Sequence, residues 1–177
     1  MKSRVIHTEQ KVGVFVDVQN MYYSAKNLYD AKVSFSEVLK EAVSGRKLLR
    51  AFAYVIKAEV GAEQEFFDAL VGQGYEVREK ELQVFAGGAK KGDWDVGLSM
   101  DAIRLAEKVD TIVLITGDGD FAALTDYLQN NKGCRVEVLA FERTTSSKLI
   151  EVADDFVDLS KDLKRFLIND KSTSKKD

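Results

Sequence analysis

The chain has 177 residues, of which 45% are hydrophobic and 31% are charged, so it can form one domain with a packed core. Its net charge of −3 provides no general attraction for nucleic acid, so a polyanionic partner would need local basic patches. A single cysteine, Cys134, and a single histidine, His7, exclude an internal disulfide and a Cys/His zinc site, and they argue against a Cys-His or Ser-His nucleophile pair. Any chemistry must therefore use carboxylates, lysine, hydroxyls, water or a metal.

No apolar run approaches the roughly 20 residues that cross a bilayer, and the first ten residues lack the apolar stretch of a secretory signal. We therefore expect a cytoplasmic protein with no membrane partner. We divide the chain into an N-terminal arm (1–10), a single domain (11–168) and a disordered polar tail (169–177).

Short apolar runs alternate with amphipathic segments along the domain, a pattern that predicts alternating strands and helices. In chain order, we predict a strand at Val12–Val16, a helix over Asn20–Tyr29, a helix of about ten residues from a capping box at Ser34–Glu37 to a stop at Gly45, a strand at Leu48–Ile56 and a helix over Glu59–Val71. A third strand region follows (Tyr75–Glu79 with Leu82–Phe85), then a flexible loop (Ala86–Gly92), a helix over Trp94–Lys108 with Asp93 as its N-cap, and a fourth strand at Thr111–Thr116. A helix over Phe121–Asn131, a strand at Arg135–Phe141, a short helix over Ser146–Val152 and a small strand near Phe156–Val157 complete the domain.

This alternation predicts the fold class. Strands that alternate with helices form a parallel sheet covered on both faces. We therefore predict an α/β fold, a three-layer α/β/α sandwich with a mainly parallel central sheet.

Aspartates follow the apolar strands, at positions that suit a crevice better than a core. Asp17 ends the first strand, and Asp118 ends the fourth. Ligands of an open parallel sheet bind beyond the carboxyl ends of the strands, where the strand order reverses. If the five main strands have the order 3-2-1-4-5, these two acids are neighbours at that point. Each could also serve only as a helix cap or turn residue.

Further acids lie close to these two along the chain. Asp95 falls in the first turn of a helix that follows a glycine-rich loop, so it can enter the same crevice. Asp101 faces about 120° away from Asp95, so both line one site only if the site is wide or if one acts through water. Asp120 is also a natural N-cap for the helix at Phe121, and we expect Asp93 to be a cap only.

Several carboxylates in one pocket repel one another, and a divalent cation removes that repulsion. Ligands that are all oxygen favour Mg²⁺ or Mn²⁺, which assist the hydrolysis of phosphodiesters. An EF-hand calcium loop is excluded, because Phe121 and Ala123 occupy positions that would need oxygen ligands.

Three motifs, in this order, resemble the NYN domain family in its bacterial and archaeal LabA-like branch. The resemblance covers residues 10–160 and implies a PIN-like fold and a ribonuclease that depends on Mg²⁺ or Mn²⁺. The motifs are Phe15–Asn20, Lys91–Ala102 and Ile115–Phe121.

The resemblance also implies roles for individual residues. The central metal-binding acids correspond to Asp17, Asp95 and Asp118, although the spacing leaves the choice between Asp93 and Asp95 open. The further residues that match the family pattern are Asp101 and Asp120 as additional acids, Asn20 beside the first acid, Thr116 before the strand-end acid, and Ser146 and Ser147 in a segment that closes over the site.

We therefore predict an endoribonuclease in which Asp17, Asp95 and Asp118 hold one or two metal ions and RNA is the partner. Lys91 or Arg143 would steady the phosphate backbone, with Asn20, Thr116 and Ser146 as further substrate contacts. Aromatic residues could stack on a base, although packing is the better interpretation for Trp94 and for at least one of Tyr22 and Tyr23.

Two other functions stay open at this point. A phosphatase of the haloacid-dehalogenase type would use Asp17 as its nucleophile, but it needs an acid two residues later, where this chain has Gln19. A regulatory module that binds RNA or protein without catalysis, with a residual metal site, fits the negative net charge and the small basic patches. A homodimer through an edge strand or the C-terminal helix is compatible with either function.

Overall fold

The computed structural model describes residues 4–58, 63–88 and 90–168. Its middle layer is a six-stranded sheet in which every neighbouring pair is parallel. The strand order is β4 (Glu76–Glu81), β3 (Lys47–Lys57), β1 (Lys11–Asp17), β7 (Thr111–Ile115), β8 (Arg135–Ala140) and β9 (Asp155–Asp158).

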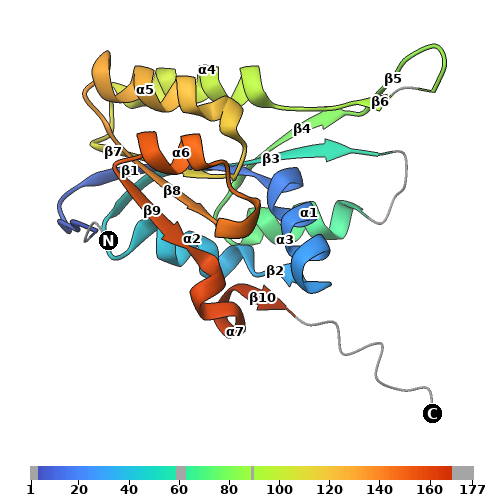
Figure 1. The fold of residues 1–177 in the computed structure, drawn as a ribbon, viewed down its shortest axis with the longest axis horizontal. Helices are drawn as coiled ribbons and strands as arrows, with labels where there is room; N and C mark the ends of the chain where they lie inside the picture. The colour runs from blue at the N-terminus through green and yellow to red at the C-terminus, as the bar shows by residue number, and fades with distance from the viewer. Residues whose placement is uncertain (1–3, 59–62, 89, 169–177) are drawn as a thin grey trace.

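Helices cover both faces of this sheet (Figure 1). One face carries α4 (Asp95–Ala106), α5 (Ala122–Asn130) and α6 (Ser147–Val152). The other carries α1 (Val18–Tyr29), α2 (Phe35–Val43), α3 (Glu63–Gly72) and the short α7 (Leu163–Phe166). Within the described ranges, the connections also contain the 3₁₀ turns η1 (Gly119–Phe121), η2 (Glu142–Thr144) and η3 (Leu159–Asp162). The predicted three-layer sandwich is confirmed, and so is the order 3-2-1-4-5 of its five main strands.

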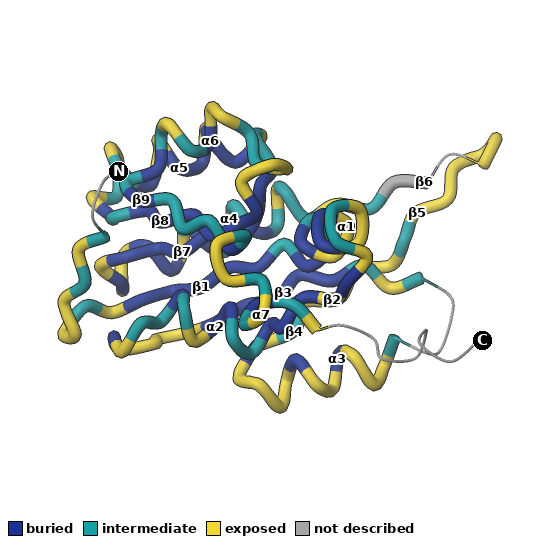
Figure 2. Tube along the Cα trace, turned by 60° about the horizontal axis from the view of Figure 1, so that its bottom comes forward, coloured by how far each residue is buried: buried dark blue, intermediate teal, exposed yellow. Residues whose placement is uncertain are grey.

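The central strands are mostly apolar because both faces of the sheet are covered. Val14 and Val16 of β1 pack into the core beneath α1, α2 and α3, whereas Phe15 between them packs into the core beneath α4 and α5. Figure 2 shows these strands as a buried centre with exposed helix surfaces around it. None of the helices in the described residues is long and apolar enough to cross a membrane.

The third strand region differs from the prediction. β4 ends at Glu81, opposite the last residue of β3, so the chain beyond it has no neighbouring strand to extend. Instead, β5 (Gln83–Val84) turns back and pairs antiparallel with β6 (Lys90–Lys91), forming a hairpin that projects from the body (Figures 1 and 2). Of the predicted strand residues Leu82–Phe85, Gln83–Val84 do form a strand, but it belongs to this separate hairpin and does not extend the central sheet. A second small pair, β2 (Lys32–Val33) with β10 (Leu167–Ile168), is too short for a sequence pattern to reveal.

Helix starts also differ in detail. Ser34 precedes α2, but its side chain makes no capping bond, and Glu37 pairs with Lys40 and Arg165 instead. The predicted capping box is therefore wrong. The predicted start of the third helix (59–62) and the predicted disordered tail (169–177) lie outside the described residues.

A buried ion pair joins β8 to the end of α2. Glu137 is fully buried, and its carboxylate accepts hydrogen bonds from Arg46 at 2.8 and 3.0 Å and from Arg4 at 2.7 Å. Arg46 also donates to the backbone oxygen of Ala42 at 2.7 Å. Removing one partner of such a group leaves uncompensated buried charge, which is far more costly than losing an exposed ion pair.

We expect Glu137→Gln to lower the free energy of unfolding by about 3 to 5 kcal/mol, because Arg46 would stay buried without a negative partner. Urea unfolding measures this change. The matched control is Glu9→Gln, which breaks the exposed pair with Lys47 and should change stability by less than about 1 kcal/mol. Equal stabilities for the two variants would contradict a structural role of the buried pair.

Candidate metal centre

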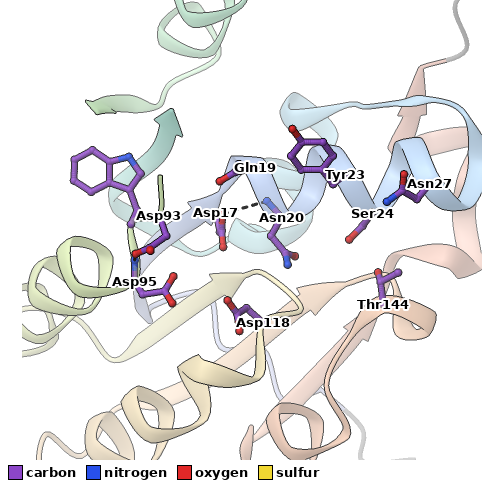
Figure 3. A pocket seen from close by; sticks show the side chains of 11 residues that line it. Asp17, Gln19, Asn20, Tyr23, Ser24, Asn27, Asp93, Asp95, Asp118 and Thr144 are labelled. Atoms are coloured by element: carbon purple, nitrogen blue, oxygen red, sulfur yellow. Dashed lines mark hydrogen bonds between the residues drawn. The ribbon is translucent and has the colours of Figure 1, made fainter. Parts of the chain in front are cut away.

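Three acids from distant parts of the chain meet at one end of the sheet. One carboxylate oxygen from each of Asp17, Asp95 and Asp118 lies within 4.8 Å of the other two. Figure 3 shows their side chains converging from the end of β1, the start of α4 and the end of β7. The predicted adjacency of the strands that carry Asp17 and Asp118 is confirmed, because β1 and β7 are hydrogen-bonded neighbours.

Asp17 combines a capping role with its place in this group. Its Oδ1 accepts from the backbone N–H of Asn20 at 3.2 Å, and so it caps α1. Its Oδ2 accepts from the hydroxyl of the buried Thr116 at 3.3 Å. The Thr116 hydroxyl in turn accepts from the backbone N–H of Asp118 at 3.2 Å. Thr116 therefore links Asp17 to Asp118 through its hydroxyl group.

Asp118, and not Asp120, caps the 3₁₀ turn η1 that follows β7. The Oδ1 of Asp118 accepts from the backbone N–H of Asp120 at 2.9 Å, while the Asp120 residue is exposed. Asp120 is not one of the three clustered acids. The prediction that it caps the following helix is therefore wrong, because the chain first makes the turn η1.

The segment after β8 packs directly on this strand end. A Cβ added to Gly117 would lie 2.6 Å from the backbone oxygen of Thr144, and one added to Gly119 would lie 2.6 Å from the Ser146 Oγ. The backbone N–H of Ser146 donates to the Gly117 oxygen at 2.9 Å. A larger residue at Gly117 or Gly119 would therefore clash with the segment after β8. Ser146 binds the loop that follows β7 through its backbone N–H. Ser147 is exposed and begins α6.

The sequence motif after Lys91 leaves both Asp93 and Asp95 as candidates for the metal-binding acid. Asp95, the first residue of α4, joins Asp17 and Asp118, whereas Asp93 is exposed at the rim of the same cavity. The Oδ1 of Asp93 accepts from the backbone N–H of Asp95 at 3.4 Å, but the N-cap position itself is taken by Trp94. The structure therefore brings Asp95, and not Asp93, into the group of three.

Trp94 forms a fixed wall beside these acids. Its indole N–H donates to the backbone oxygen of Val55 at 2.8 Å, and its ring centroid lies 5.3 Å from that of Tyr54. A Cβ on Gly97 would lie 2.5 Å from the indole ring, so only glycine lets this ring fold against its own helix. The Nζ of Lys80 lies 5.4 Å from the ring centroid.

Asp101 lies outside the group. Its Oδ2 accepts from the Tyr54 hydroxyl at 2.8 Å, and its carboxylate lies 3.4 Å from Arg104 and 3.7 Å from Arg78. Six residues along an α-helix rotate the side chain well away from Asp95, as the helical repeat requires. Asp101 is therefore neutralised by protein cations and not by a ligand shared with the cluster.

The other residues predicted to contact the substrate lie at different distances from the cavity. Asn20 lines the cavity, and its Oδ1 accepts from the backbone N–H of Gly117 at 2.9 Å. Arg143 is exposed in η2, beside the cavity-lining Thr144. Lys91 contributes backbone to β6, and its side chain lies outside the described part of the structure.

The acids line one end of a cavity of about 390 Å³, and uncharged groups line the rest. Sequence reasoning did not select Ser24, Asn27 or Thr144 for this second part. For Ser24 and Asn27, the sequence feature that could have revealed them is a row of polar residues at helical spacing along α1, after Asp17. Tyr22 and Tyr23 are 40% and 51% exposed, so the expectation that at least one packs in the core is wrong. Besides Trp94, the uncharged lining residues are Gln19, Asn20, Tyr23, Ser24, Asn27 and Thr144.

Burial and mutual repulsion alter the acidity of this group. Burial raises the pKa of Asp17 to about 6, and the charges of Asp118 and Asp93 add to that rise, against hydrogen bonds from Asn20 and Thr116. Burial also raises the pKa of Asp95 to about 6, with further contributions from Asp118, Asp93, Asp17 and Asp120. Without a cation, Asp17 and Asp95 therefore take up protons at a mildly acidic pH at which an ordinary aspartate is still ionised.

We expect Asp17→Asn to stabilise the metal-free protein at pH 7.5 by about 2 to 3 kcal/mol and to have little effect at pH 4. The folded pKa of Asp17, about 6, lies above its ordinary value of 3.8. The stability that the protonated Asp17 carboxyl gives the folded wild type is therefore fully present below pH 3.8. It is lost as the pH rises through 6 and this buried group ionises. Asn keeps an acceptor for the helix cap.

Urea unfolding in EDTA at the two pH values measures this difference. Asp126→Asn, which removes an exposed acid from α5, is the control. If the stability of Asp17→Asn depended on pH in the same way as that of the wild type, the raised pKa of Asp17 would be ruled out.

Comparison with known proteins identifies the family. The NYN domain family matches residues 11–160. The chain is 25% identical over 166 residues to the low amplitude and bright protein LabA of Synechococcus elongatus, covering 89% of this chain and 87% of that protein. It is also similar to a crystal structure of a protein of unknown function from Vibrio parahaemolyticus, with a TM-score of 0.83 and 34% identity over 95% of this chain and 100% of that one. The chain therefore belongs to the NYN domain family, in agreement with the resemblance in its three motifs.

Proposed function

We propose that this chain is a metal-dependent phosphodiesterase that cleaves RNA internally. The observation that carries this proposal is the convergence of Asp17, Asp95 and Asp118 within 4.8 Å at the carboxyl end of a parallel sheet. NYN domains are generally nucleases and bind RNA, which supports the choice of substrate.

The residues present fit a hard divalent cation. All three clustered groups offer carboxylate oxygen, the ligand that Mg²⁺ and Mn²⁺ prefer. Burial, and to a smaller extent repulsion between the carboxylates, raises the pKa values of Asp17 and Asp95, and a bound cation would offset both effects. Asp17, Asp95 and Asp118 would therefore hold one or two ions of Mg²⁺ or Mn²⁺. Asp101 is engaged by Tyr54 and two arginines, so we leave it out of the ligand set.

Such an ion, when bound, polarises a phosphoryl oxygen and lowers the pKa of water. The protein's own residues position the substrate around it. Thr116 orients Asp17 through its hydroxyl, and Asn20 presents a carboxamide at the edge of the acids. Lys80, whose Nζ donates to the backbone oxygen of Asp93 at 3.0 Å, adds positive charge at the rim. Arg143 and Lys91 are the proposed contacts to the phosphate backbone, and Asp120 acts on the cluster only through its charge.

A phosphatase mechanism with Asp17 as nucleophile has less support. It requires an acid two residues after the nucleophile, and Gln19 at that position lines the cavity as an uncharged amide. Failure to trap a phosphoryl group on Asp17 would agree with hydrolysis by water.

We expect Asp118→Asn to reduce Mn²⁺-dependent cleavage of RNA by at least about 100-fold, because one of three metal ligands is lost. Asn can still accept the hydrogen bond from Asp120, so the fold should persist. Gel analysis of labelled single-stranded and structured RNA measures cleavage, with circular dichroism as the folding check. Asp101→Asn is the matched control and should retain most activity. Full turnover by Asp118→Asn would refute the assignment.

Metal binding provides a readout that does not depend on cleavage. We expect Mn²⁺ to raise the Tm of the wild type, since a ligand at 100 times its Kd stabilises the folded state by about 2.7 kcal/mol. Asp118→Asn should lose most of that rise, Asp101→Asn should keep it, and EDTA should reverse it. Equal metal-induced shifts in both variants would place the ion elsewhere. A wild type that binds RNA and metal without cleavage would instead indicate a regulatory module.

A further inference from the structure

The uncharged part of the cavity is built mainly by one stripe of α1. Asn20, Tyr23, Ser24 and Asn27 recur at the spacing i, i+3, i+4 and i+7, which places them on one side of a helix. Thr144 faces them from the connection after β8 (Figure 3). The stripe begins three residues after Asp17, so it is continuous with the acid cluster.

Tyr23 differs from the other aromatic residue of the cavity. Trp94 is fixed by its hydrogen bond to Val55 and is covered by Tyr54 and Gly97, so it serves as a wall. Tyr23 is 51% exposed, and among the described residues its ring contacts only the ring of Tyr22, edge to face at a centroid distance of 5.3 Å. A half-exposed aromatic ring beside a cavity provides a face for a flat partner.

The amides of this stripe have hydrogen-bonding capacity to spare. Asn20 uses its Oδ1 to accept from Gly117, which leaves its side-chain nitrogen as a donor. Within the described part of the chain, the carboxamide of Asn27 has no protein partner. The stripe therefore combines an open ring with donors and acceptors and no charge.

The composition of the cavity limits what can occupy it. The acid end would attract a phosphate once it held a cation, whereas none of the residues that line the α1 end of the cavity is charged. Its volume of about 390 Å³ falls near the lower end of small-ligand pockets, about 300 to 1,000 Å³, which suits one nucleotide and not a duplex. A paired base, moreover, has its hydrogen-bonding edge already engaged.

We infer that the α1 end of the cavity is a base-binding subsite for the nucleotide next to the scissile phosphate. The base of an unpaired nucleotide stacks on Tyr23, and the carboxamides of Asn20 and Asn27 bind its edge. This inference rests on the proposed function, because it takes the acid cluster to be the phosphate end. Tyr23 is thus a specificity-determining residue that selects unpaired RNA.

Adjacent tyrosines supply a matched pair of variants. Tyr22 has the same chemistry and similar exposure, but it lines a different surface hollow with Lys26 and Asp30. The full-length chain carrying Asp118→Asn, in which cleavage is blocked, is titrated in EDTA against a fluorescein-labelled single-stranded RNA of about ten nucleotides. Fluorescence anisotropy reports the Kd, and circular dichroism confirms that each variant is folded.

Adding Tyr23→Ala should raise the Kd by about 10-fold, whereas Tyr22→Ala should change it by less than about 2-fold. Tyr23→Trp should restore binding, because an indole also stacks. The same RNA annealed to its complement should bind at least about 10-fold more weakly. Equal effects of the two alanine variants, equal binding of duplex and single strand, or no measurable binding would each overturn the subsite.

The outcome separates this inference from the proposed function. If the wild type does not cleave but single-stranded RNA binding depends on Tyr23, hydrolysis is refuted and the base subsite stands. If the wild type cleaves RNA and Tyr23→Ala binds it as tightly as the parent, the subsite is refuted and the hydrolytic proposal stands.

Discussion

Repulsion among Asp17, Asp95 and Asp118 is the constraint around which this end of the molecule is organised. Bringing three carboxylates within 4.8 Å opposes folding unless something else forces them together. The force comes from burial of β1 and β7, whose apolar side chains lie in the cores on both faces of the sheet. Because these strands are parallel neighbours, their carboxyl ends coincide, and the acids that follow them cannot separate.

Local structure at the site serves two purposes at once. Asp17 and Asp118 each cap the turn of chain that follows them, and each also points a carboxylate into the cavity. Capping and metal binding are therefore not competing interpretations, since each carboxylate oxygen has two lone pairs and can accept a hydrogen bond from the protein while it also faces a cation. Thr116 links the two acids, and close packing at Gly117 and Gly119 supports their loops.

Charge is divided sharply along the cavity, and that division connects the two proposals. The acid end suits a cation and a phosphate, and the α1 end suits a neutral, flat group. The protein's net charge of −3 makes such local recognition more important, because no general field attracts a polyanion. Specific contacts by a few side chains must then provide the affinity.

The sequence by itself determined the fold class, the alternation of strands and helices and the strand-end positions of Asp17 and Asp118, because these follow from local periodicity. Only the tertiary structure decided that Asp95 joins them while Asp101 pairs with Tyr54 and arginines, since helix rotation and loop geometry act over long distances. The turn of Leu82–Phe85 into a hairpin depended on where β3 ends, 25 residues or more earlier along the chain. The stripe from Asn20 to Asn27 was visible as a pattern, but its meaning required the opposite wall at Thr144, which no local signal places there.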